Sequence, residues 1–368
     1  MTQDSKMVLS KIKNWYGKYE RPISSLSLIG GFVFDALTLK RVDLFWENFW
    51  VVGHLVIVGT AMVLVHALEK QEGDEANPSK AHFWLVNIVQ FFFGGILSTY
   101  LVFYFRSSDI AVSWPFLLIL ALCFWANEAL KRHFVRLTFQ ISLFFLSLFS
   151  FAIFLVPVIF HRLGAGMFMV SGAVSLVVMA LFLLIVRYFS KAEFEASKKT
   201  LYLCIGGIFL LMNVLYFTDL IPPIPLSLKD AGVYYSVRRD SQGNYLTVGE
   251  LPVWQNYFKI YPDFHAVAGE PVFVYSAIFS PPSLNLDVAH EWQHLDLSGN
   301  WQTISKINLH IVGGRDGGFR TYSKKTTNLT PGHWRVNVLT QTGQVIGRVR
   351  FNLILADVLP RVEQKVNN

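Results

Sequence analysis

The segment His290-Glu291-Trp292-Gln293-His294 fits the pattern H-E-x-x-H. On a helix, two histidines four residues apart share one face and can bind Zn²⁺, while the glutamate acts as general base on the zinc-bound water. On a strand, the same two positions lie ~13 Å apart, at ~3.3 Å per residue, which is too far for one metal ion. The pattern therefore predicts a zinc peptidase only if the segment is helical.

A third zinc ligand is the further requirement of such a peptidase. The metzincin extension needs glycine and then histidine at the positions that Leu297 and Asn300 occupy. The only glutamate after Glu291 is Glu363, close to the end of the sequence. Because the surrounding segments are also typical of strands, we expect a structural role for His290 and His294, and no metal or other cofactor.

Four ionisable residues lie inside or beside long apolar runs: Asp35, Glu47, His54 and Glu128. Ionisable groups are costly in hydrocarbon, so each is a candidate for a proton or substrate path. Glu47 and His54 are two helical turns apart and would face the same way. The alternative is structural, with Glu47 and Glu128 at the headgroup level and Asp35 and His54 hydrogen-bonded to neighbouring helices.

Several tryptophans of the last third could form an aromatic platform for a glycan or a lipid headgroup, namely Trp292, Trp301 and Trp334, together with Trp254. Buried tryptophans are common in the cores of β-sandwiches, which is the alternative role for the same residues.

The elements that must position these residues are first of all membrane helices. The chain has 368 residues, of which 53% are hydrophobic and 15% charged, against about 25% charged in soluble proteins. Crossing the bilayer takes about 20 apolar residues. Six runs meet this length, at 44–68, 82–105, 110–130, 137–160, 163–186 and 200–218, and a marginal seventh covers 23–39.

The distribution of lysine and arginine favours counting the marginal segment as a span. With six spans, the two sides carry nine basic residues each, which gives no orientation. With seven spans, fourteen lie on one side and four on the other. Because basic residues gather on the cytoplasmic side, we expect a cytoplasmic segment 1–22, a bundle over 23–218 and an extracytoplasmic C-terminus.

The remainder of the chain has the pattern of a β domain. A proline-rich linker is expected over 219–231, since Pro222, Pro223 and Pro225 end the last helix. Over 232–368, short segments rich in Val, Ile, Tyr and Phe alternate with turns, which is typical of an immunoglobulin-like β-sandwich. From 227 onward, 14 basic residues nearly balance 11 acidic ones, so no nucleic-acid partner is expected.

Part of the chain resembles a bacterial family known as domain of unknown function 2914. The resemblance rests on Gly269-Glu270-Pro271, on Ala289-His290-Glu291-Trp292 and on the stretch 321–353 with its Pro-Gly-x-Trp-Arg-Val segment. The apolar stretches 30–39 and 221–229 are similar to the membrane portion that precedes this domain in some members. The resemblance implies an inner-membrane protein with a periplasmic domain. It implies no activity.

Two interpretations of function remain open beside the zinc peptidase. In the favoured one, a non-enzymatic protein anchored in the bilayer binds an envelope protein, glycan or lipid through its periplasmic domain. In the other, a transporter or membrane-embedded enzyme acts on lipid or envelope polymer through the intramembrane carboxylates.

Overall fold

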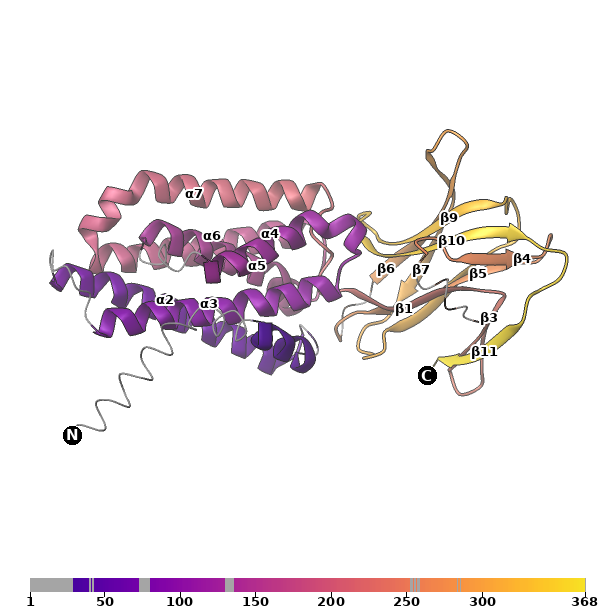
Figure 1. Cartoon of the computed structure of the whole chain (residues 1–368), viewed down its shortest axis with the longest axis horizontal. Helices are drawn as coiled ribbons and strands as arrows, with labels where there is room; N and C mark the ends of the chain where they lie inside the picture. Colours follow the sequence, from indigo (N-terminus) through magenta and orange to yellow (C-terminus); the bar gives the residue numbers. More distant parts are fainter. Residues whose placement is uncertain are drawn as a thin grey trace, which may run out of the picture. The chain divides into compact units, whose positions relative to one another are not determined.

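A computed structural model describes residues 29–367, except 40, 42, 73–79, 130–135, 252, 253, 255, 257, 258, 283 and 285. The chain forms two compact units (Figure 1). The helical unit contains the described residues up to Phe103, Pro115–Val156 and Gly166–Val214. The β unit contains Leu215–Asn368 and two short helical connections, Tyr104–Trp114 and Pro157–Ala165.

Within the described residues, six helices are long and apolar enough to cross a membrane, as is typical of a membrane protein. They are α2 (Phe45–Glu72), α3 (Lys80–Arg106), α4 (Ile110–Ala129), α5 (Leu137–Phe160), α6 (Ala165–Phe189) and α7 (Lys191–Phe217). Their bounds agree closely with the six predicted runs, except that α7 begins nine residues early. That extra length is polar, with Glu193, Glu195 and three lysines, so hydropathy alone did not mark it as helix.

The helices of this unit pack through aromatic rings against small residues. Helix α5 is the most enclosed of the six, since 72% of its most apolar 18-residue stretch is buried. A Cβ on Gly172 of α6 would lie 3.1 Å from Phe209 and 3.3 Å from Phe149, so the glycine lets the rings approach closely. Small residues serve this purpose in membranes, where close packing replaces the hydrophobic effect. This arrangement explains much of the high phenylalanine content.

The predicted seventh span is only partly described. Residues Ile29–Thr38 form a short apolar helix, which is shorter than a bilayer crossing requires. The rest of that segment, 23–28, and the predicted cytoplasmic segment 1–22 lie outside the described residues.

The described residues of the β unit form three sheets. Its strands are β1 (Ser227–Tyr234), β2 (Ser236–Arg239), β3 (Tyr245–Glu250), β4 (Asp263–Ala266), β5 (Val272–Phe279), β6 (Leu286–Leu295), β7 (Trp301–Ile311), β8 (Phe319–Lys325), β9 (Gly332–Thr340), β10 (Val345–Leu355) and β11 (Val362–Asn367). The sheet orders are β1-β5-β8, β4-β10-β9-β6-β7 and β11-β3-β2. Every pairing is antiparallel except that of β10 with β4.

Strand β5 shows how the sheets are layered. Val272 and Val274 join the core against the five-stranded sheet, which includes Trp292, Trp334 and Phe351. Tyr275 and Ala277 instead pack against Val237 of β2. Because β5 is buried on both faces, the sheet β1-β5-β8 lies between the other two.

The predicted linker 219–231 is shorter in the structure, because strand β1 already begins at Ser227. The connection between α3 and α4 also belongs to the β unit. It is anchored there by Asp109, whose Oδ1 lies 3.5 Å from Nη2 of Arg350 on β10.

Candidate ligand-binding face of the five-stranded sheet

The H-E-x-x-H segment lies on strand β6, between β7 and β9. His290 is fully buried and sits between two hydroxyl groups, Ser276 Oγ at 2.8 Å from Nε2 and Ser323 Oγ at 2.8 Å from Nδ1. Burial lowers the pKa of His290 to about 4, because the charged imidazolium would lose its hydration. His290 is therefore a neutral core residue with both ring nitrogens satisfied.

The other two residues of the motif have separate surroundings. Glu291 points to the outer face of the sheet, where it accepts hydrogen bonds from Thr303 and Asn337, both at 3.0 Å. His294 lies near the end of β6, with Nε2 3.2 Å from the carbonyl oxygen of Pro331. In the described part of the chain, no three His, Cys, Asp or Glu side chains gather as metal ligands would.

Two of the three tryptophans predicted as ligand contacts belong to the core instead. Trp292 and Trp334 are 0% exposed and meet edge to face, 6.4 Å between ring centroids. Their indole nitrogens donate to Ser323 Oγ and to the carbonyl oxygen of Thr330. These rings cannot reach a ligand, because even-numbered positions of β6 and β9 face the core.

Trp301, the third candidate, lies at the start of β7 and is partly exposed. The guanidinium carbon of Arg335 lies 4.1 Å from its ring centroid, which is a cation–π contact. Tyr261 stacks near it at 6.2 Å and continues to His333 at 4.4 Å. Trp301 is thus one part of an aromatic group at the edge of the outer face. The fourth tryptophan, Trp254, is 69% exposed.

Three arginines stand beside these rings on the two middle strands of the sheet. Arg335 on β9 lies directly opposite Arg350 on β10, and Asn337 lies opposite Arg348. Like charges directly opposite each other destabilise a sheet, so folding alone does not favour this pairing. We call Arg335, Arg348 and Arg350, with Trp301 and Tyr261, the arginine face.

In two of these arginines, Nε is hydrogen-bonded to a neighbouring side-chain amide. Arg335 Nε donates to Gln293 Oε1 at 2.6 Å, and Arg348 Nε donates to Asn337 Oδ1 at 2.6 Å. Among the described residues, the terminal Nη groups of these two side chains have no hydrogen bond or ion pair. The guanidinium groups are therefore fixed in direction with their outer donors available, a geometry suited to carboxylate or phosphate.

The electrostatic balance of the arginine face is positive. Burial lowers the pKa of Arg335, and the charge of Arg348 lowers it further. Burial also lowers the pKa of Arg348, with Asp109 opposing and Arg350 adding to the shift. Two carboxylates, Glu291 and Asp109, face three guanidinium groups. An added anion would relieve this repulsion.

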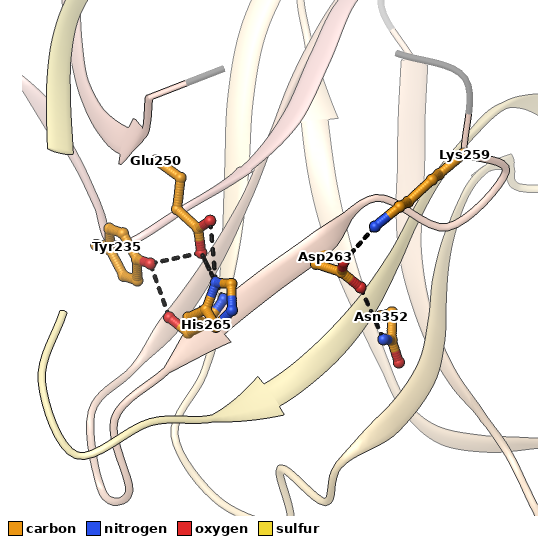
Figure 2. A network of polar contacts seen from close by, with 6 residues as sticks. All are labelled: Tyr235, Glu250, Lys259, Asp263, His265 and Asn352. Atoms are coloured by element: carbon orange, nitrogen blue, oxygen red, sulfur yellow. Dashed lines mark hydrogen bonds and ion pairs between the residues drawn. The ribbon is translucent and has the colours of Figure 1, made fainter. Parts of the chain in front are cut away.

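Figure 2 shows a network at the other edge of the sheet, around β4. The carboxylate of Glu250 accepts hydrogen bonds from Tyr235 Oη at 2.7 Å and from the backbone N–H of His265. Its Oε2 also lies 3.2 Å from His265 Nδ1. Because Glu250 ends β3 and His265 belongs to β4, this carboxylate ties two sheets together.

The same view shows a side-chain hydrogen bond that joins the edge strand β4 to its neighbour β10 (Figure 2). Asp263 on β4 accepts from Lys259 Nζ at 2.5 Å and from Asn352 Nδ2 at 2.9 Å. The Lys259 hydrogen bond lowers the pKa of Asp263 most strongly. Asn352 lies opposite His333, so this edge positions the aromatic group.

The intramembrane candidates lie in the helical unit. Asp35, on the short helix Ile29–Thr38, interacts electrostatically with His54 of α2. Nδ1 of His54 lies 2.9 Å from the carbonyl oxygen of Trp50. Glu47, in the first turn of α2, accepts from the backbone N–H of Arg41 at 3.1 Å. Glu128 lies near the end of α4, and its side chain is outside the described residues.

An apolar groove of about 760 Å³ opens between α2, α5 and α6. Its lining is almost wholly hydrocarbon and aromatic, with Thr60 and Ser175 as its polar side chains. No group in this lining can transfer a proton near neutral pH, so the groove has no features of a hydrolytic site.

The sequence reasoning missed the arginines, although their pattern contained a signal. In Trp334-Arg335-Val336-Asn337 and Arg348-Val349-Arg350-Phe351, polar and apolar residues alternate strictly. This alternation predicts strands with one polar face. The cross-strand register that brings the arginines together was not readable from either segment alone.

Comparisons with known proteins give a family for the C-terminal region and little else. No curated protein matches the chain significantly. Among solved structures, a β-glucosidase of Listeria innocua in complex with isofagomine matches 32% of this chain and 16% of its own length, at 15% identity and TM-score 0.19. An alkylpurine DNA glycosylase of Pseudomonas fluorescens bound to DNA matches 84% of this chain and 99% of its own length, at 12% identity and TM-score 0.21. These scores are too low to support any shared fold. As the resemblance in sequence led us to expect, residues 285–353, which run from β6 to β10, match the family described as protein of unknown function, DUF2914.

Proposed function

We propose that the protein is a multi-pass protein of the bacterial inner membrane, with a cytoplasmic N-terminus and a periplasmic β unit. The fourteen-to-four bias of basic residues supports seven spans, with the first over 23–39. In this proposal, the two sheets around Trp292 and Trp334 correspond to an immunoglobulin-like sandwich. The sheet β11-β3-β2 is added to one side.

The proposed role of the β unit is to bind an anionic ligand of the cell envelope, without catalysis. The observation that carries this proposal is the arginine face, in which guanidinium groups are oriented by amides but keep free outer donors. Partly buried arginines beside aromatic rings are the residues that most often dominate binding surfaces. The helices then hold the binding domain at the membrane.

Binding of envelope components to the full-length protein tests this role. We expect at least one anionic component, lipid or glycan, to bind protein reconstituted in zwitterionic nanodiscs. Trp301→Ala should weaken this binding about tenfold, because it removes the ring under Arg335, a contact of about 1–2 kcal/mol with partly desolvated groups. Biolayer interferometry at fixed salt measures the change.

Trp254→Ala is the matched control, because it removes an exposed tryptophan outside the arginine face. It should leave binding unchanged. If no anionic component binds, or if both variants bind like the parent, the arginine face is not the binding surface.

A further inference from the structure

One residue of the arginine face, Arg350, contacts the connection between two apolar helices, α3 and α4. Asp109 lies in the connection between α3, which ends at Arg106, and α4, which begins at Ile110. Both helices are long and apolar enough to span the bilayer. A connection of three residues reaches at most about 10 Å from the helix ends. Asp109 therefore stays at the membrane–water interface.

Aromatic and apolar side chains around this connection support its location at the membrane–water interface. Trp114 is 56% exposed and Ile110 is 53% exposed, both within the first turns of α4. Exposed tryptophan near a helix end is typical of the interfacial belt. The polar headgroup layer is about 5–8 Å thick on each side of the hydrocarbon core.

The arginine face includes two residues of β10, Arg350 and Arg348. Nη2 of Arg350 lies 3.5 Å from Asp109 Oδ1, a long contact that leaves other donors of Arg350 available. Arg348 lies two residues away on the same face, and Asp109 also acts on it electrostatically. Arg350 and Arg348 therefore lie close to Asp109 and to the connection between α3 and α4.

We infer that the arginine face binds the phosphate of an anionic phospholipid headgroup in the outer leaflet of the membrane. Arg348 and Arg350 contact the phosphate, and Arg335 on its tryptophan ring contacts the outer part of the headgroup. The inference rests on the proposed function and names its ligand. Charge complementarity, and the contact of Arg350 with the connection between two apolar helices, favour a lipid over a soluble anion.

Native mass spectrometry of the full-length protein in detergent, with dioleoylphosphatidylglycerol as probe, tests this inference. Each arginine near an anionic surface contributes about 1 kcal/mol, so R348Q/R350Q should bind about 30-fold more weakly. Dioleoylphosphatidylcholine should bind parent and variant alike. The control variant R238Q/R239Q removes two exposed arginines of β2 and should bind phosphatidylglycerol like the parent.

A second variant, R348K/R350K, keeps the charge and guards against misfolding of the glutamine variant. It should recover part of the binding, because lysine lacks the two-pronged donor geometry of arginine. The inference is overturned if R348Q/R350Q retains phosphatidylglycerol as the parent does. It is also overturned if inorganic phosphate or an acidic oligosaccharide competes at equal concentration, in which case the face still binds an anion and only the lipid assignment fails.

Discussion

Replacing Trp334 with alanine is expected to lower the free energy of unfolding of the β unit by about 3–5 kcal/mol. The ring is 0% exposed and packs against Trp292, so its removal leaves a cavity in the centre of the core. The substitution also removes the hydrogen bond that the indole N–H donates to the carbonyl oxygen of Thr330, at 2.8 Å. Hydrogen exchange of the β9 and β6 amides in the full-length protein measures the effect.

Trp301→Ala serves as the control for this prediction. Its ring lies on the outer face, so the expected loss is under about 1 kcal/mol, as for most surface substitutions. Equal losses for the two variants would contradict the assignment of Trp334 to the core and Trp301 to the ligand-binding face.

The stability of the β unit is expected to fall by about 3 kcal/mol as the pH drops from 6.5 to 4, because of His290 alone. An unfolded histidine titrates near 6.5, whereas burial holds the folded pKa of His290 at about 4. The unfolded state therefore binds the proton first. The stability is fully present above pH 6.5 and is lost as the pH falls toward the folded pKa, at about 1.4 kcal/mol per pH unit.

His290→Asn removes this titration and is the matched variant. It should be less stable at pH 7.5, since Ser276 and Ser323 lose their shared partner. Its stability should depend less on pH between 6.5 and 4. Below pH 4 both proteins should lose stability together, because the pKa of Asp263 is lowered in the folded state. Chemical denaturation at several pH values separates the range from pH 6.5 to 4 from the range below pH 4. If the free energy of unfolding changes equally with pH in both proteins between pH 6.5 and 4, the role given to His290 is refuted.

The local patterns of this sequence predicted elements better than they predicted contacts. Hydropathy marked six helices within a few residues, because a spanning helix must be apolar along its whole length. Short segments rich in Val, Ile, Tyr and Phe, separated by turns, marked the C-terminal region as a β domain. Short strands such as β3 and β11 carry charged or small residues between their apolar positions, so alternation does not mark them.

The roles of single residues required the register between strands. Trp292 and Trp301 have the same chemistry. Which of them lies in the core depends on the face of the sheet to which each side chain points. Likewise, the pairing of Arg335 with Arg350 joins residues fifteen positions apart, across the turn between β9 and β10. A one-residue shift would have placed both side chains in the core.

Membrane topology is the measurement that tests the central claim most directly, because a periplasmic ligand requires a periplasmic β unit. Alkaline phosphatase and a green fluorescent protein can be fused in turn to the C-terminus of the full-length protein in a bacterial host. We predict high phosphatase activity and no fluorescence, as for a fusion exported across the inner membrane. A fluorescent fusion without phosphatase activity would place the arginine face in the cytoplasm and contradict the proposed function.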